Sequence, residues 1–168
     1  MAKRALTCLA IDPGVSGAAA LVRFDPVKTH CEVVAVHDLP VLTEHTSAGK
    51  LRRSIDPVRL AALVAGLDFD LLAVERLVAP PGIHSVTAYS LGKTAGTIHA
   101  VAALADRPIK LVSPNVWKRA LGVPADKGGA RRFASKYFGR DDHWPRAGHH
   151  NRAEAALIGV WALAARGA

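Results

Sequence analysis

The apolar run at residues 6–11 constrains the fold more than any other stretch, because it ends abruptly in Asp12-Pro13-Gly14. Its length and continuity are typical of a buried strand, and proline followed by glycine ends such a strand at once. A carboxylate at the end of a buried strand is held rigidly at the edge of the sheet, which suits a metal ligand or a general base. An Asp that merely opens a turn is the competing interpretation.

The order of the predicted elements indicates an α/β fold. Strands predicted at 6–11, 17–24 and 31–39 follow one another closely, which favours an antiparallel meander. A helix with Asp56 as its N-cap precedes a strand at 71–77, and a strand reached through a helix is expected to run parallel to the first one. A loop is expected at 40–54, followed later by a long helix at 85–105, a short strand at 109–112, and helices at 115–121, 131–138 and 151–165.

Composition predicts one domain, 1–168, with an anionic partner. The chain has 168 residues, of which 50% are hydrophobic, enough for a sizeable core. Lys and Arg number 22 against 14 Asp and Glu, a formal net charge of +8 that favours nucleic acid. No apolar run is long enough for a membrane span and no secretory signal is recognisable, so we expect a cytoplasmic protein without a membrane partner. Cys8 and Cys31 are expected to be buried free thiols.

Two further acids stand where they can reach the same edge of the sheet. Glu75 interrupts the apolar strand at 71–77, and a carboxylate there is costly unless it is paired or metal-bound. Pairing with Arg76 is the alternative, although adjacent strand residues point to opposite faces. Glu154 is placed in the first turn of the last helix, where interaction with the helix dipole is the alternative. With Asp12 these two acids make three oxygen ligands, which suit Mg²⁺ or Mn²⁺. The pattern predicts hydrolysis of a phosphodiester by two metal ions.

Positive charge is concentrated in the last third of the chain. A solvated basic face is the simple interpretation, but this much uncompensated charge on a loop and a helix favours contact with phosphates. Trp117, in the same region, is expected either to anchor its helix by burial or to stack on a base. The candidate nucleic-acid-binding residues are Lys118, Arg119, Lys127, Arg131, Arg132 and Lys136.

The long helix at 85–105 carries Gly92, Gly96 and several Ala residues on one side. Small residues let a second backbone approach closely, and either the sheet or a second subunit can fill that place. His99 lies among apolar residues of this helix and is expected in the core or in an interface.

Together these motifs resemble the RuvC-type Holliday junction resolvases of the ribonuclease-H-like superfamily, particularly its compact phage and bacterial members. The resemblance implies a mixed five-stranded sheet flanked by helices, and a homodimer that places two active sites on opposing strands of a four-way junction. Its motifs are Ile11–Gly14 with Gly17, Ala73–Leu77, the helix with Gly92, Lys93 and Gly96, Ser113–Lys118 with the Lys127 region, and Asn151–Ala155.

The resemblance also implies four metal ligands, and the fourth is altered here. Asp12, Glu75 and Glu154 match the family's acids, whereas Asn151 stands three residues before the last one, where the family usually has an acid. His149 and His150 are alternative ligands, and His150 is also a candidate proton donor or acceptor. Loss of one negative charge should weaken the binding of the second metal ion, and a nitrogen ligand would favour Mn²⁺.

Three functions remain open on the sequence. The first is a crossover junction endodeoxyribonuclease of DNA recombination or repair, in a bacterium or a phage-infected host. The second is a module that binds branched nucleic acid without cutting it, since Asn151 replaces an acid. The third is a nuclease of forks, flaps or RNA–DNA hybrids. A kinase of the actin-like ATPase superfamily is a weaker alternative, because the second phosphate loop is missing, and no nucleotide cofactor is expected.

Overall fold

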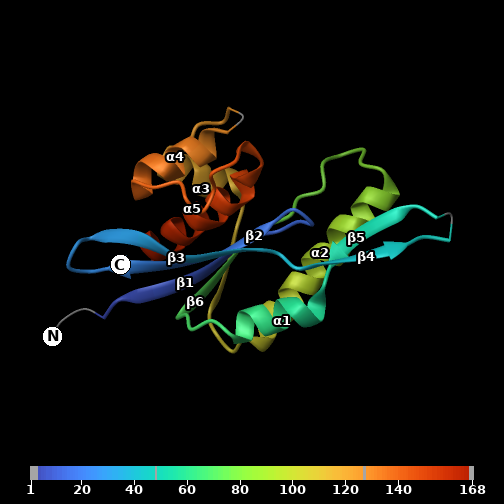
Figure 1. The fold of residues 1–168 in the computed structure, drawn as a ribbon, viewed down its shortest axis with the longest axis horizontal. Helices are drawn as coiled ribbons and strands as arrows, with labels where there is room; N and C mark the ends of the chain where they lie inside the picture. Colours follow the sequence, from blue (N-terminus) through green and yellow to red (C-terminus); the bar gives the residue numbers. More distant parts are fainter. Residues whose placement is uncertain (1–3, 48, 127, 167–168) are drawn as a thin grey trace.

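The computed structural model describes residues 4–47, 49–126 and 128–166. Its centre is a five-stranded sheet with the strand order β3-β2-β1-β6-β7 (Figure 1). The first three strands pair antiparallel, and β6 and β7 run parallel to β1. This confirms the mixed sheet that the sequence predicts. The strands are β1 Leu6–Asp12, β2 Ala18–Asp25, β3 His30–Asp38, β6 Leu71–Glu75 and β7 Ile109–Val112.

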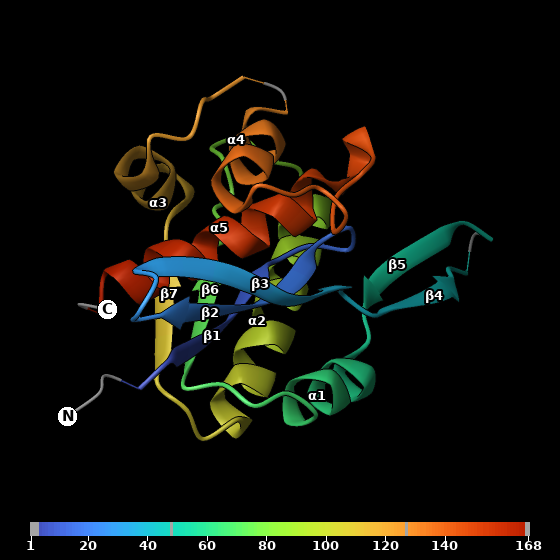
Figure 2. The ribbon, with the colours of Figure 1, turned by 60° about the vertical axis from the view of Figure 1, so that its left-hand side comes forward.

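Helices cover both faces of this sheet (Figure 2). On one face, α1 and α2 pack over a core of alternate strand residues such as Leu9, Ile11 and Leu72. On the other face α5 lies directly on β1 and β2, and α3 and α4 pack against α5. The helices are α1 Pro57–Ala65, α2 Ser85–Leu104, α3 Pro114–Leu121, α4 Gly129–Phe138 and α5 His150–Ala164, with a short 3₁₀ turn, η1 Ala147–His149, before α5.

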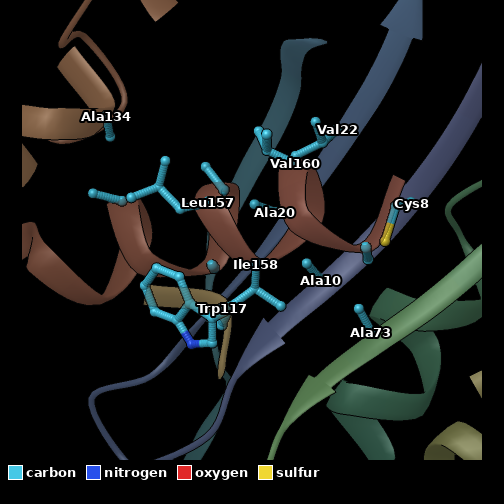
Figure 3. Packing of buried hydrophobic residues seen from close by; sticks show 14 of the residues in the cluster. Cys8, Ala10, Ala20, Val22, Ala73, Trp117, Ala134, Leu157, Ile158 and Val160 are labelled. Carbon is cyan, nitrogen blue, oxygen red and sulfur yellow. The ribbon is translucent and has the colours of Figure 1, made fainter. Parts of the chain in front are cut away.

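Small side chains let α5 approach the sheet closely. Ala10, Ala20 and Ala73 lie on the face beneath it (Figure 3). At Gly159 on α5, an added Cβ would lie 2.6 Å from Cγ2 of Val22, so a side chain there would push the helix away. Because α5 is sandwiched between the sheet and two helices, it is apolar nearly all round. The candidate acid that it carries is therefore fixed tightly against the strands.

Residues 40–54, expected as a loop, instead form most of a β-hairpin. β4 Val41–His45 pairs antiparallel with β5 Leu51–Ile55 in a separate two-stranded sheet. The prediction was wrong because β5 is largely exposed and contains two arginines, so it lacks the apolar alternation that marks a half-buried strand. The hairpin projects from the body of the protein beside the end of β1 (Figure 2).

Several element boundaries differ from the sequence expectation. β6 ends at Glu75, two residues earlier than expected, so this acid terminates its strand as Asp12 terminates β1. α4 begins at Gly129. α5 begins at His150 rather than Asn151, which moves Glu154 out of the first turn. Interaction with the helix dipole is confined to that turn, and it therefore no longer explains Glu154.

The small side of α2 is not used against the sheet. An added Cβ at Gly92 or Gly96 would meet no described atom within 4 Å, so these positions are open. His99 is exposed, so the core alternative was wrong and the interface alternative stays a prediction. Only Thr94, Ile98, Val101 and Ala102 of this helix are buried. A second subunit on the open side stays a prediction.

Both cysteines are buried free thiols, as expected. Burial raises the pKa of Cys8 to about 12, so this thiol is unsuited to nucleophilic chemistry. Among the described residues, no helix combines the length and apolar character that crossing a lipid bilayer requires.

Candidate active site

Strand register places two carboxylates side by side. β1 and β6 run parallel with Ile11 opposite Val74. The next residue on β1 is Asp12 and the next on β6 is Glu75, so both acids stand at the same edge of the sheet. Asp12 is buried, with 7% of its surface exposed, and Glu75 is partly buried. The structure therefore confirms the prediction that Asp12 and Glu75 stand at the same edge of the sheet.

The loop after β1 folds back tightly on Asp12. The N–H of Gly17 donates to the carbonyl of Gly14 at 2.9 Å. An added Cβ at Gly17 would lie 2.2 Å from the backbone oxygen of Asp12, closer than any side chain can come. Gly17 is therefore required for β1 to turn directly into β2, which fixes the backbone that carries the first acid.

Trp117 holds Glu75. Its Nε1–H donates to Oε2 of Glu75 at 2.6 Å, and its ring is fully buried between α5 and the sheet (Figure 3). α3 follows directly after β7, the strand next to β6, so the chain brings the indole to the carboxylate. Full burial excludes stacking on a base. Of the two alternatives that the sequence left open, burial as a helix anchor is the one confirmed. The sequence gave no sign of the bond to Glu75.

Glu154 reaches the same place from α5. Its Oε1 accepts a hydrogen bond from Nζ of Lys118 at 2.8 Å. The same ammonium lies 5.1 Å from the centroid of the Trp117 ring. Lys118, expected to meet phosphate, is thus placed at the carboxylate cluster itself and offsets part of its negative charge.

The acids influence one another's ionisation. Burial raises the pKa of the Asp12 carboxyl well above its ordinary value, and the negative charges of Glu75 and Glu154 raise it further, against a smaller lowering by Lys118. Burial also raises the pKa of Glu75; the hydrogen bond from Trp117 opposes this, and the charge of Glu154 adds to it. The three acids thus form one electrostatically coupled cluster. We call Asp12, Glu75 and Glu154 the carboxylate cluster.

The carboxylate cluster offers the donor atoms that a hard divalent cation prefers. Its ligands are oxygens, and its buried negative charge is only partly neutralised by Lys118. Within residues 4–47, 49–126 and 128–166, no three His, Cys, Asp or Glu side chains form a preassembled metal centre. The fit to such an ion therefore rests on the donor chemistry of the three acids and on their shared electrostatics at one edge of the sheet.

The candidates for the fourth ligand lie at the start of α5. Nδ2 of Asn151 donates to the carbonyl of Ser16 at 2.6 Å, which ties α5 to the loop after Asp12. His150 is exposed at the first helical position. Nδ1 of His149 accepts the N–H of Arg146 at 3.4 Å. Burial and the nearby arginines Arg152 and Arg146 lower the pKa of His149.

Arg152 anchors this start of the helix to the sheet. Its Nε and Nη2 donate to the two carboxylate oxygens of Asp38, at 2.7 and 2.6 Å, and its Nη1 donates to the carbonyl of His143 at 3.3 Å. Asp38 ends β3, so the paired bond fixes α5 against the same sheet edge. The hydrogen bond from Arg152 lowers the pKa of Asp38. Nothing in the sequence pattern predicts this contact.

A cationic cavity of about 560 Å³ adjoins the carboxylate cluster between α3, α4 and α5. It brings together several residues singled out in the sequence: Lys118, Arg131, Arg132, His150 and Glu154. Arg132 pairs with Asp126 at the cavity wall. Arg119 and Lys136 are exposed but do not line the cavity, and Lys127 lies outside the described residues.

Comparison with known proteins agrees with this architecture. No protein-family model and no curated protein sequence matches the chain. Among solved structures, the fold is similar to Thermus thermophilus RuvC in complex with a Holliday junction substrate (TM-score 0.62, 14% identity, covering 95% of this chain and 96% of that one). It is also similar to T. thermophilus RuvC alone (0.57, 18%, 96% and 97%) and to the yeast mitochondrial Holliday junction resolvase Ydc2 (0.54, 15%, 93% and 77%). The chain therefore has the ribonuclease-H-like fold of the RuvC-type Holliday junction resolvases.

Proposed function

We propose that this protein is a divalent-metal-dependent endonuclease that hydrolyses phosphodiesters of branched DNA, with the four-way junction as its substrate. One observation carries the proposal: three acids from β1, β6 and α5 form a coupled, partly buried cluster next to a cationic cavity. A fold shared with RuvC and other resolvases supports junction DNA as the substrate. The biological setting would be recombination or repair.

Asp12, Glu75 and Glu154 would hold Mg²⁺ or Mn²⁺, two ions in the complete site. Bound there, such ions supply an activated water and stabilise the leaving oxygen of the phosphodiester. His150 and Asn151 are the proposed sources of the fourth ligand. The amide nitrogen of Asn151 donates to Ser16, so Asn151 could bind only through its Oδ1. We favour His150, because it lines the cavity beside Glu154 and Asn151 does not.

The protein's own residues position the DNA and the acids. Trp117 holds one oxygen of Glu75, which leaves the other oxygen available. Lys118 lines the cavity together with Glu154, and its ammonium can attract a phosphate as well as the carboxylate. Arg131 adds a cation to the cavity wall. In this arrangement the scissile phosphate is drawn to the carboxylate edge by cations on the α5 face of the sheet.

Two active sites are needed to cut opposing strands of one junction, so we propose that the protein acts as a homodimer. The open side of α2, with Gly92 and Gly96 free of described neighbours, supports close approach of a second subunit. Light scattering at micromolar concentration, with and without junction DNA, tests this. A strict monomer on the junction would contradict the two-site scheme.

The substrate is tested by comparing labelled four-way junctions, forks, flaps and RNA–DNA hybrids as substrates, in Mg²⁺, in Mn²⁺ and with a chelator. We expect the junction to be cut fastest, in paired strands, and all cleavage to stop without divalent metal. Faster cleavage of a fork, flap or hybrid would indicate that the protein is a different class of nuclease with the same fold.

A module that only binds junctions is the second candidate. It is supported by Asn151 in place of an acid and by the ion pair that Lys118 makes with Glu154, which occupies one ligand oxygen. Tight junction binding with no product in either metal would favour this candidate over the nuclease.

A further inference from the structure

The β4–β5 hairpin is anchored at its base and exposed at its tip. Ser54 and Ile55 at the end of β5 are buried. Across the base, the N–H of Asp56 donates to the carbonyl of Pro40 at 2.9 Å. The Asp56 side chain also caps α1, accepting from the N–H groups of its first turn. The described residues from 42 to 53 are mostly exposed. The hairpin is therefore an arm on a rigid root (Figure 2).

The root of this arm touches the loop that follows Asp12. Nη2 of Arg53 donates to the carbonyl of Val15 at 3.1 Å. Leu39, just before the hairpin, donates its N–H to the carbonyl of Gly17 at 2.9 Å. These bonds place the arm at the same end of the sheet as Asp12. A substrate seated on the carboxylate cluster would therefore have the hairpin beside it.

A cleft of about 230 Å³ separates the hairpin from α2, and its lining is cationic. Arg52 and Arg53 come from β5, Lys93 comes from α2, and Glu44 is the one acid. Glu44 lies directly opposite Arg52 in the strand register and offsets one of the three charges. Among the residues that the structure describes, Arg52 and Lys93 have no hydrogen-bonded or ion-paired partner.

The chemistry of the cleft fits a phosphate backbone. Its cations are solvent-accessible, whereas a pocket for a small metabolite is mostly apolar and encloses its ligand. Tyr89 of α2, which is 66% exposed, adds an aromatic ring at the same wall. Exposed cations that have no partner in the protein are the usual contacts of nucleic-acid phosphates.

Position also favours DNA. The hairpin packs on the α2 side of the sheet, while the cavity with Lys118 and Arg131 lies on the α5 side. The carboxylate cluster stands between them, at the ends of β1 and β6. A DNA backbone that crosses this edge of the sheet would meet cations on both sides of the cut position.

We propose that the cleft between the β4–β5 hairpin and α2 is a second DNA-binding surface, which holds the phosphates of one duplex arm beside the cleaved strand. The proposal rests on the proposed nuclease function. It assigns to the hairpin the role of fixing the direction in which that arm leaves the active site.

The test removes the two unpartnered cations together, as Arg52→Ala with Lys93→Ala in the full chain. Junction affinity is measured as a function of salt, and cleavage is measured at saturating DNA. We expect the Kd to rise about tenfold near physiological salt, and the slope of log Kd against log salt to fall by about two, one for each lost phosphate contact. The single-turnover rate at saturation should stay within about twofold, because neither residue touches the carboxylate cluster.

The matched control is Lys28→Ala with Arg166→Ala, which removes the same charge from the opposite end of the sheet. It should leave the salt slope nearly unchanged. Glu44→Gln should act in the opposite direction and tighten junction binding about two- to fivefold, an effect that misfolding cannot imitate.

The outcomes separate the two proposals. A wild-type protein that cuts junctions, with an Arg52/Lys93 double variant that matches the control in affinity and slope, overturns the hairpin proposal alone. A wild-type protein that binds no DNA overturns both. A double variant that changes the oligomeric state without changing the salt slope also overturns the hairpin proposal, since the cleft would then serve a subunit contact.

Discussion

Trp117 donates its indole N–H to Glu75 at 2.6 Å from a position with no solvent exposure. The bond joins α3 to the end of β6 and fixes one carboxylate oxygen of the cluster. In the proposed metal site, a ligand with one oxygen held would be ordered before any cation arrives, and removing such outer contacts commonly changes metal affinity or activity by about 10- to 100-fold.

Trp117→Phe removes the donor while keeping most of the ring. We expect cleavage to fall by about tenfold or more, with a higher Mn²⁺ concentration needed for half-maximal rate, because Glu75 loses its fixed orientation. Stability should fall by about 1–3 kcal/mol through lost volume and the lost hydrogen bond. Metal titrations of the single-turnover rate measure the first effect, and urea unfolding measures the second.

The matched control is Trp144→Phe. Trp144 is also fully buried, and its indole N–H donates to Oγ of Ser135 at 3.0 Å, away from the carboxylate cluster. It should lose a similar amount of stability and keep its metal dependence. An equal shift of metal dependence in both variants would show that the Trp117 effect comes from packing alone.

Asp12→Asn should make the metal-free protein more stable at neutral pH. The pKa of Asp12 is raised in the folded state by burial and by its acidic neighbours, so ionisation of this carboxyl opposes folding. The penalty is absent below the ordinary Asp pKa and grows as pH rises toward the folded-state value. We therefore expect a gain on the order of 1 kcal/mol near pH 7 that disappears near pH 3. Thermal unfolding in a chelator across this range measures it.

Asp56→Asn is the control for that gain. Asp56 is equally buried, but it caps α1, accepting two backbone N–H groups at 3.0 Å. Asn is also a good cap, so this change should be nearly neutral or slightly destabilising. A destabilised Asp12→Asn protein at pH 7 would contradict the account of an uncompensated buried charge.

Arg152→Gln should lower activity more than stability. Its bidentate pair with Asp38 is largely exposed on the Asp38 side, where ion pairs contribute about 0–1 kcal/mol. The same pair, however, positions the start of α5, which carries His150 and Glu154. We expect a fall in the single-turnover rate of about tenfold with little change in junction affinity. Arg140→Gln removes an exposed ion pair with Asp142 and should leave the rate unchanged. An equal fall in the single-turnover rate for both substitutions would contradict a positioning role of Arg152.

His150→Ala and Asn151→Ala distinguish the candidates for the fourth ligand. His150 lines the cavity with Glu154, whereas Asn151 does not line it and ties α5 to the carbonyl of Ser16. We expect His150→Ala to raise the Mn²⁺ concentration needed for half-maximal cleavage more than Asn151→Ala does. Asn151→Ala should act mainly on stability. The reverse order, measured by metal titration of cleavage, would assign the ligand to Asn151.

Much of the fold was predictable because its elements carry strong local signals. The apolar strands, the Asp56-Pro57 helix start and the strand-ending acid Asp12 each follow from short-range patterns. The β4–β5 hairpin was missed because its strands are short, polar and exposed, and only backbone hydrogen bonds define them. Local patterns do not record such pairing.

Within the site, residue types were easier to predict than contacts. The three acids followed from their places on strands and helix. The bonds from Trp117 to Glu75 and from Arg152 to Asp38 join residues far apart in sequence, and they depend on the packing of β7 and α5. The boundary shift that placed His150 at the start of α5 depends likewise on tertiary structure.

The role of the carboxylate cluster is tested by comparing wild type and Asp12→Asn on a labelled four-way junction, with binding and cleavage measured in parallel in Mg²⁺ and Mn²⁺. We predict metal-dependent cleavage by the wild type. We predict no detectable product from Asp12→Asn, at nearly unchanged junction affinity, because the cationic surfaces remain. An Asp12→Asn protein that cuts as fast as the wild type would contradict the assignment of the carboxylate cluster as the active site.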